Sequence, residues 1–378
     1  AEFTRVLMAD LQRSGIFRVL DPAAYIEDPQ KSGTIREDIN FGSWAAIGAL
    51  GLVRGSYRGT PGGMTIEVRF FDVAAGSSLG GNKLSGKTSS AGAMAHRTAD
   101  EIMKFVTGKA GPFDSWISFV SNRDSRFREI YIYSFDGRVE ALTAHRSITM
   151  APAWSPDAES LLFTSFKDGH PALYSYDLAS GSDRRLAYRH GVNVGGAWSP
   201  GGQSVLFSRA VDGNTDVYSL SLASRRVTRL TSHWGIDVDP AWSPDGKRIA
   251  FCSSRSGSPQ IYVMSARGES PRRISFQGRY NCTPAWSSDG RSLAWTGRVD
   301  GRFQIFTKLL DGGSPRQLTF EGENEHPTWS PDSRFIAFSG RRGSKRSIYM
   351  VGVLTGIITQ LTVGPGDDTS PNWSAGLH

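Results

Sequence analysis

The 378-residue sequence has few cysteines and no long hydrophobic run. Its most apolar stretch, residues 44–53, is short and broken by Gly48 and Gly51, so we expect no membrane-spanning helix and no direct membrane insertion. Charge of one sign is not concentrated either: 43 basic residues are spread among 36 acidic ones, a net charge of +7. We therefore predict no nucleic-acid partner. Hydrophobic residues at 39% and charged residues at 21% are typical of a globular protein.

One segment departs from this even spread of charge. Residues 341–346 include Arg341, Arg342, Lys345 and Arg346, and they fall where a hairpin turn is expected. We favour a turn exposed to water, and the alternative is a patch that attracts an anionic partner.

The two cysteines, Cys252 and Cys282, are 30 residues apart in adjoining repeats. We favour two free, buried thiols. The alternative is a disulfide between neighbouring repeats, which would require an oxidising compartment.

A short phrase built around tryptophan recurs through the last two thirds of the chain. The spacings between successive tryptophans of the repeat are 44, 44, 44, 43 and 44 residues. Short apolar strands and Asp-Gly, Ser-Gly or Arg-Gly turns fill each period, a pattern typical of a β-propeller with four strands in each blade. The repeated tryptophans are Trp154, Trp198, Trp242, Trp286, Trp329 and Trp373.

The two ends of the repeat region complement each other. Residues 117–120, 129–135 and 139–143 match the second, third and fourth strands of a blade, with no first strand before them. The segment around Trp373 supplies a first strand with nothing after it. We therefore predict a six-bladed propeller over residues 112–378, closed by the C-terminal strand, which removes the unpaired sheet edge.

The first 111 residues show no such repeat and are predicted to form a small α/β domain. Helical spacing covers residues 3–13 and 92–107, with Gly108 as the stop, and a helical turn is expected at 44–48. Strands are predicted at 16–20, 49–57, 64–73 and 83–88. The chain opens inside an amphipathic segment without a start Met, which is compatible with the removal of an N-terminal piece.

Two catalytic patterns in this domain lack the context they need. Residues 81–88 fit a phosphate-binding loop, but no buried strand leads directly into them and no helix opens at Lys87. Residues 76–80 fit a nucleophile elbow, but the domain is too small for a hydrolase sheet and offers only His96 downstream. We interpret both as structural glycine-rich segments, and we predict no catalytic residue and no cofactor.

Three histidines, His145, His190 and His233, lie eight or nine residues before a repeat tryptophan. They are expected in equivalent loops on one face of the propeller. We favour solvated residues or partner contacts, and the alternative is a metal site.

The residues just before each first strand form the best candidate site, because equivalent loops surround one mouth of the channel. Most are polar or acidic and a few are apolar, a mixture that suits a docked protein or peptide. Ordinary turn chemistry is the competing interpretation. The candidates are Met150, Asn193, Val194, Asp237, Asp239, Asn281, Thr283, Asn324, Glu325, His326, Asp368, Thr369 and Ser370.

Together, the tryptophan repeats and the preceding α/β domain resemble the TolB family of the Tol-Pal cell-envelope system. Outside the repeats, the segments that carry the resemblance are residues 9–17, 44–49, 96–102 and 142–147. The resemblance implies a non-enzymatic periplasmic protein that serves outer-membrane integrity and constriction during cell division. It implies binding of the lipoprotein Pal at the propeller mouth, with His145 and the residues above as contacts, and of TolA through the N-terminal side, with outer-membrane proteins as further partners. The flexible segment and first strand with which the family begins are absent before the first helix, so no TolA site is assigned.

Two other classes of protein remain as alternatives. One is a propeller enzyme that uses a metal at the mouth, such as a polysaccharide lyase. The other is the propeller of a peptidase, which would need a hydrolase domain, and the chain ends at His378 with the predicted ring just closed.

Overall fold

The computed structural model describes residues 2–28, 33–187 and 192–377. The chain divides into two compact units, Ala1–Asp114 and Ser115–His378. The division lies three residues from the boundary expected from the sequence. Among the helices of the described ranges, none is both long and apolar enough to cross a bilayer.

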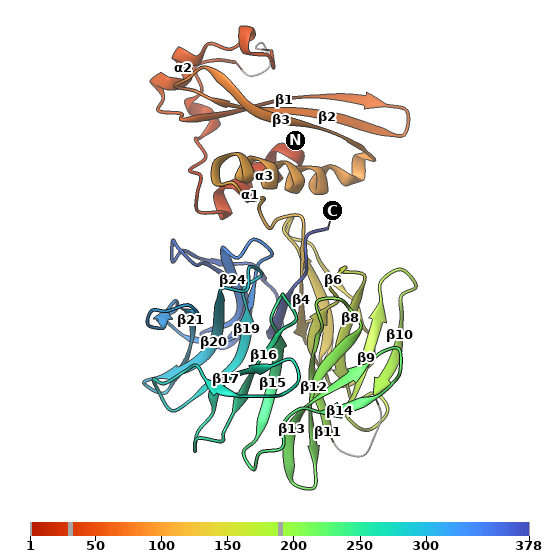
Figure 1. Ribbon diagram of the computed structural model, residues 1–378. Helices are drawn as coiled ribbons and strands as arrows, with labels where there is room; N and C mark the ends of the chain where they lie inside the picture. Colours follow the sequence, from red (N-terminus) through yellow and green to blue (C-terminus); the bar gives the residue numbers. More distant parts are fainter. Residues whose placement is uncertain (1, 29–32, 188–191, 378) are drawn as a thin grey trace. The chain divides into compact units, whose positions relative to one another are not determined.

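The N-terminal unit combines helices with an antiparallel sheet in the order β1-β2-β3 (Figure 1). Its elements are α1 (Glu2–Arg13), α2 (Phe41–Ala46), β1 (Gly51–Thr60), β2 (Gly63–Asp72), β3 (Ser77–Gly86) and α3 (Ala91–Thr107), with short 3-10 helices at Pro22–Ala24, Arg36–Asp38 and Thr88–Ser90. The predicted helices are confirmed, and Gly108 caps α3 with a left-handed φ of 78°. The prediction of a strand at 16–20 is wrong, because this segment has no strand neighbour among the described residues. The third strand begins at Ser77, earlier than the predicted start at residue 83.

A buried ion pair joins α1 to α3. Asp10 interrupts the apolar face of α1, and its Oδ2 lies 2.5 Å from Nδ1 of His96 on α3. One turn further along α3, Asp100 accepts hydrogen bonds from the backbone N–H groups of Phe113 and Asp114. Burial raises the pKa of Asp100 to about 7, although these two bonds oppose the rise. The polar residues of the helical faces therefore hold the end of this unit in place.

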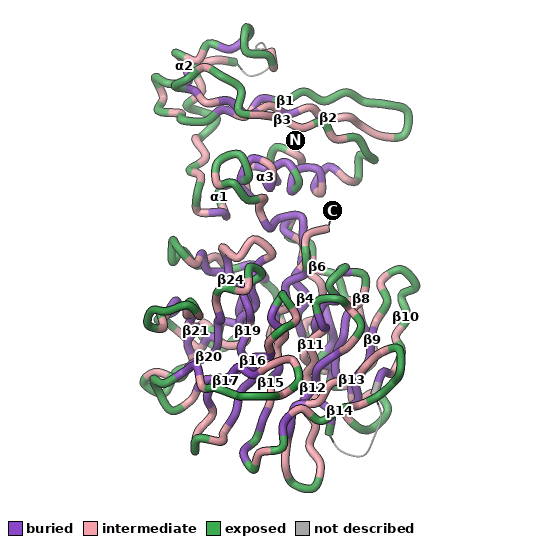
Figure 2. The backbone as a smooth tube through the Cα atoms, viewed as in Figure 1, coloured by how far each residue is buried: buried purple, intermediate pink, exposed green. Residues whose placement is uncertain are grey.

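The second unit consists of four-stranded antiparallel sheets, as the tryptophan repeat predicts. Six of them lie within the described residues, and their strands are mostly buried (Figure 2). Five sheets are consecutive: β7 (Thr149–Trp154), β8 (Ser160–Ser165), β9 (Ala172–Asp177) and β10 (Ser182–Ala187); β11 (Val192–Trp198), β12 (Ser204–Val211), β13 (Asn214–Ser221) and β14 (Val227–Arg229); β15 (Asp237–Trp242), β16 (Arg248–Ser253), β17 (Gln260–Ser265) and β18 (Arg272–Arg273); β19 (Asn281–Trp286), β20 (Ser292–Val299), β21 (Arg302–Leu309) and β22 (Arg316–Gln317); and β23 (Glu323–Trp329), β24 (Phe335–Arg342), β25 (Lys345–Gly352) and β26 (Ile358–Gln360).

The remaining sheet joins the two ends of the unit. Its order is β27-β4-β5-β6, with β4 (Trp116–Ser121), β5 (Glu129–Ser134), β6 (Val139–Ala141) and β27 (Asp368–Trp373). Trp373 pairs with Ile117, and its indole Nε1 donates to Ser115 Oγ at 2.7 Å. The predicted pairing of the last strand with the first strands of the unit is confirmed.

The repeat tryptophans connect neighbouring sheets. The indole Nε1 of Trp198 donates to the carbonyl of Ala153 in the preceding sheet at 3.2 Å, and Trp286 donates in the same way to Ala241 at 3.1 Å. Trp329 repeats the contact in the next sheet. These three tryptophans thus satisfy their indole N–H groups at the preceding sheet, whereas the buried Nε1 atoms of Trp154 and Trp242 have no hydrogen-bond partner among the described residues.

The cysteines form a disulfide, so the favoured prediction of free thiols is wrong. Cys252 on β16 is bonded to Cys282 on β19, which connects two adjacent sheets. The spacing in the sequence could not decide between free thiols and a disulfide, because the distance of 5.0 Å between the two Cα atoms results from the packing of one sheet on the next.

We predict that the Cys252→Ser, Cys282→Ser double variant lowers the free energy of unfolding. The bond closes a loop of 30 residues, and constraining such a loop in the unfolded chain contributes about 3 kcal/mol. Urea unfolding followed by tryptophan fluorescence measures the difference. A reductant should destabilise the wild type and leave the variant unchanged; equal stability of the two proteins without reductant would contradict the prediction.

Candidate partner-binding site

The first strand of each propeller sheet contains a β-bulge. In β7 the register shifts between Met150 and Ala153, and the same shift recurs in β11, β15, β19, β23 and β27. Each bulge contains one residue with a left-handed φ, between 51° and 69°. Such a φ is unusual for any residue with a side chain, above all for a β-branched threonine. The six bulge residues are Ala151, Gly195, Asp239, Thr283, His326 and Ser370.

Hydrogen bonds from one sheet to the next hold these bulges. The N–H of Asp239 donates to Ser208 Oγ on the preceding sheet at 3.2 Å, and the N–H of Ser370 donates to Ser339 Oγ at 2.9 Å. Gly195 and His326 make the same contact with Thr164 and Thr296. The strained conformation is therefore set by packing between sheets.

At the junction between the sheet of β15–β18 and the sheet of β19–β22, the disulfide takes the place of this hydrogen bond. Cys252 occupies the place that a serine or threonine has in the four junctions above, 31 residues before Thr283. It is bonded to Cys282, the residue next to Thr283. The disulfide thus lies directly behind one of the six bulge residues.

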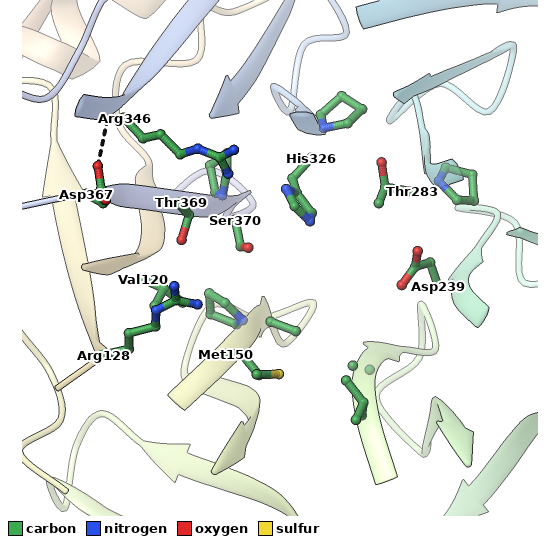
Figure 3. Close-up of a pocket in the computed structure, with 18 of the residues that line it drawn as sticks. Val120, Arg128, Met150, Asp239, Thr283, His326, Arg346, Asp367, Thr369 and Ser370 are labelled. Carbon is green, nitrogen blue, oxygen red and sulfur yellow. Dashed lines mark hydrogen bonds between the residues drawn. The ribbon is translucent and has the colours of Figure 1, made fainter. Parts of the chain in front are cut away.

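All six bulge residues and the residue after each line one cavity of about 670 Å³ (Figure 3). Proline follows the bulge residue in five strands and Gly196 follows it in the sixth. Proline has no N–H to leave unpaired at a bulge, so it is tolerated there. The cavity therefore has a rigid wall of short and mostly apolar groups, from which a few polar side chains project.

The charged groups of the cavity lie on two sides of it. Figure 3 shows Arg128 and Arg346 on one side and Asp239 on the other. Arg346 forms an ion pair with Glu325 at 3.0 Å, and its backbone N–H donates to Asp367 at 2.9 Å. A bound group would therefore meet the carboxyl group of Asp239 at one wall, and two arginines with the carboxylate of Asp367 beside them at the opposite wall.

The enclosed position of the cavity shifts the pKa values of two of these groups. Asp239 is exposed to the cavity, but the surrounding protein removes part of its hydration and thereby raises its pKa. His326 and the N–H of Thr283 oppose this rise. Desolvation lowers the pKa of His326, although Glu325 and Asp239 favour its protonated form. Nδ1 of His326 is buried and has no hydrogen-bond partner among the described residues.

The structure brings six of the residues predicted from the sequence together around the cavity, and Ser370 with them. The six are Met150, Val194, Asp239, Thr283, His326 and Thr369. They are bulge residues or their immediate predecessors in the first strands.

Five other predicted residues are buried between sheets, two positions before each bulge. Asp237 pairs with Arg255 at 2.9 Å, and Asp368 pairs with Arg123 at 2.6 Å. Asn281 donates to Gln260 Oε1 and accepts from the indole of Trp295, which leaves it only 4% exposed. Asn193 and Asn324 are equally inaccessible. Since a partner cannot reach these side chains, we revise their expected role from contact to internal support.

Glu325 and His145 are engaged inside the protein as well. Glu325 is held by Arg346, and Nε2 of His145 lies 2.6 Å from Asp183 on β10. His145 also stacks on Phe163. Of the other loop histidines, His233 accepts a hydrogen bond from the N–H of Gly235, and His190 lies outside the described residues. Within the described ranges, no group of three or more His, Cys, Asp or Glu side chains is arranged to hold a metal.

Sequence reasoning missed Arg128 and the bulge prolines, and it considered Arg346 only as part of a cationic turn, not as a residue of the cavity. Arg128 and Arg346 come from third strands and from the turns before them, a part of the repeat that the tryptophan phrase does not mark. A signal for the bulge was present: proline stands two positions before the tryptophan in five of the six repeats, as in Pro240-Ala241-Trp242.

Repeated four-stranded sheets around a central cavity, preceded by a small domain of helices and an antiparallel sheet, make this protein a two-domain β-propeller protein. Residues 103–377 match the family model of the TolB beta propeller domain, and residues 1–79 match that of the TolB amino-terminal domain. The chain belongs to the TolB family.

Relatives of known name and structure agree with this. A Tol-Pal system protein TolB from Syntrophotalea carbinolica is 40% identical over 163 residues, 43% of this chain and 38% of that protein. In this match the chain spans less than half of the relative's length. The crystal structure of TolB from Acinetobacter baumannii has a TM-score of 0.91 at 27% identity, and the match covers 99% of this chain and 93% of that one. An oligogalacturonate lyase in complex with manganese shares only the fold, with a TM-score of 0.50 at 17% identity over 65% of this chain and 73% of that one.

We predict that the imidazole of His326 titrates below pH 6.5 and that Asp239→Asn and Glu325→Gln each lower its pKa further. Burial disfavours the imidazolium, and each of the two carboxylates favours it, so removing either carboxylate removes an opposing effect. The Cε1–H chemical shift of His326, followed by NMR against pH, measures the value. Asp311→Asn, on an exposed loop between β21 and β22, is the control and should change nothing. A pKa that rose in either test variant would show that the carboxylates do not act on this ring.

Proposed function

We propose that this protein binds the lipoprotein Pal at the mouth of the propeller cavity, as a non-enzymatic component of the Tol-Pal system in the periplasm. The observation that carries the proposal is the ring of six bulges, which presents Asp239, Thr283, His326 and Ser370 to one cavity of about 670 Å³. Rigid walls with a few separated charges favour recognition of a structured protein surface, because the site loses little conformational entropy on binding.

We infer that the six sheets form one closed ring of six blades. Two contacts support this: β23 packs against β27, and β27 in turn packs against β7, so that the last and first sheets of the repeat are joined through the shared one. A closed ring has no unpaired sheet edge, and its mouth would keep its shape when a partner is pulled away.

The revised contact set is smaller than the one expected from the sequence. It comprises the residues that line the cavity, namely Met150, Val194, Asp239, Thr283, His326 and Thr369, together with Arg128 and Arg346. The apolar members, Met150 and Val194, line the cavity together with the bulge prolines. Such a mixture of apolar contacts with a few charges is usual at interfaces between proteins.

The periplasmic location and the further partners rest on separate grounds. A disulfide between Cys252 and Cys282 is stable in an oxidising compartment such as the periplasm. Kinship with Tol-Pal system proteins supports a role in outer-membrane integrity and in constriction during cell division. We also propose TolA as a partner of the N-terminal side and outer-membrane proteins as further contacts, without assigning residues to either.

We predict that Asp239→Arg lowers the affinity for Pal by about 10-fold to 100-fold, since a buried contact residue of an interface commonly contributes 1–3 kcal/mol. The measurement is isothermal titration of the purified protein with the soluble domain of Pal from the same organism. Asp311→Arg is the matched control: it makes the same charge change on a loop that does not line the cavity, and it should bind like the wild type. Unchanged binding by Asp239→Arg would remove the cavity from the proposal.

A further inference from the structure

The junction that carries the disulfide holds its bulge differently from the four junctions with a hydroxyl. At those four, the N–H of the bulge residue donates to a serine or threonine of the preceding sheet, over distances between 2.9 and 3.2 Å. Cys252 takes the place of that hydroxyl, and its sulfur is bonded to Cys282. Since sulfur is a weak hydrogen-bond acceptor, the N–H of the bulge residue Thr283 has no comparable partner on the preceding sheet.

The N–H of Thr283 acts on a side chain of the cavity instead. It donates a hydrogen bond to the carboxyl group of Asp239, the bulge residue of β15, and so favours the ionised form. Figure 3 shows these two residues at the same side of the cavity. Oδ2 of Asp239 lies 3.7 Å from Sγ of Cys282, which is a packing contact because a disulfide sulfur carries no proton. The disulfide and the N–H beside it therefore meet one carboxyl group that lines the cavity.

The bulge itself does not explain why a disulfide stands at this junction. Val120 has the place of Cys252 before the bulge at Ala151, where it offers neither a hydroxyl nor a thiol, and the bulge forms there as well. What sets the disulfide junction apart is its neighbour. Asp239 is the only bulge residue of the six with a carboxyl group, and the disulfide lies at the junction that follows it.

We propose that the disulfide is a positioning element of the cavity, which joins the two sheets covalently and thereby leaves the N–H of Thr283 to hold the carboxylate of Asp239. Cys252 and Cys282 are positioning residues in this arrangement, since they act through Thr283. With a hydroxyl in place of Cys252, this N–H would serve the contact between the sheets, as it does at Asp239 itself. This role goes beyond the proposed function, because it concerns the charge and orientation of Asp239 whatever occupies the cavity.

Other titratable and charged groups also act on Asp239 or face it across the cavity. Burial raises the pKa of Asp239, and His326 opposes that rise together with the N–H of Thr283. Burial raises the pKa of Tyr280, and Asp239 raises it further. The complete set comprises Tyr280, His326, Glu325, Arg128 and Arg346. None of them is altered in the variants below, so a difference between those variants reports on the N–H of Thr283.

The test compares two variants that lack the disulfide and differ only at residue 252. Both carry Cys282→Val, because Val238 has the equivalent place before the bulge at Asp239. The first adds Cys252→Ser, which supplies the hydroxyl that Ser208 has at its own junction. The second adds Cys252→Ala, which supplies no acceptor. Both variants lose the cross-link, so a general loosening of the two sheets is common to them.

We expect the pKa of Asp239 to be higher in the Cys252→Ser variant than in the Cys252→Ala variant. In the first, the N–H of Thr283 returns to the hydroxyl and no longer favours the ionised carboxyl group. The Cγ chemical shift of Asp239, followed by NMR against pH, measures the value. The amide proton of Thr283 should follow the titration of Asp239 in the wild type and in the Cys252→Ala variant, and lose this dependence in the Cys252→Ser variant. Asp239→Asn in the wild type should abolish it, which identifies the titrating group.

Either of two results would overturn the proposal. Equal pKa values of Asp239 in the two variants would show that the disulfide serves only as a cross-link. An amide proton of Thr283 that does not follow Asp239 in the wild type would show that the hydrogen bond is not made, and this measurement stands even where a variant fails to fold. Binding of Pal enters neither measurement, so a failure of the proposed function is seen separately.

Discussion

The bulge at the start of each propeller sheet is the constraint on which the site depends. A regular strand would alternate its side chains between two faces, and each residue before the tryptophan would keep a fixed side. The extra residue at Ala151, and at its five equivalents, breaks the alternation and brings the bulge residue of each first strand to the central cavity. Left-handed φ values at residues with side chains cost about 1 kcal/mol each. In four of the six bulges the N–H of the bulge residue donates to a serine or threonine of the neighbouring sheet, which holds this conformation, and at Thr283 the disulfide lies directly behind the bulge.

Behind this accessible ring lies a second ring that is inaccessible. Two positions before each bulge, Asp237, Asn281 and their equivalents are buried and bonded to neighbouring strands and loops. Buried polar groups of this kind are stable only when their hydrogen bonds are made, so they fix the position of the loop that carries them. The inner ring lines the cavity, and the outer ring holds the geometry of the inner one. Two residues of similar chemistry, Asp237 and Asp239, thus have opposite roles.

How much of the fold and of the cavity could be predicted from the sequence depends on what information a periodic pattern carries. The spacing of Trp154 to Trp373 was enough to predict repeated four-stranded sheets and the pairing of the last strand with the first ones. It also located the strand on which the site lies. It could not separate Asp237 from Asp239, because both are polar and close to the same tryptophan, and only the bulge decides which of them faces the cavity. Asp10 raised the same difficulty in α1, where a polar residue on an apolar face proved to be one half of a buried pair with His96.

Contacts between repeats escaped prediction for a different reason. The bond from Cys252 to Cys282, and the place of Arg128 beside the cavity, depend on how one sheet packs on the next. A repeat specifies each blade nearly independently of its neighbours, so departures from the repeat carry the information about a particular site. Cysteine at a position where other junctions have Ser208 or Thr296 is such a departure. The shared residues of the repeat build the sheets, and the residues that differ between repeats set the contacts of a particular junction.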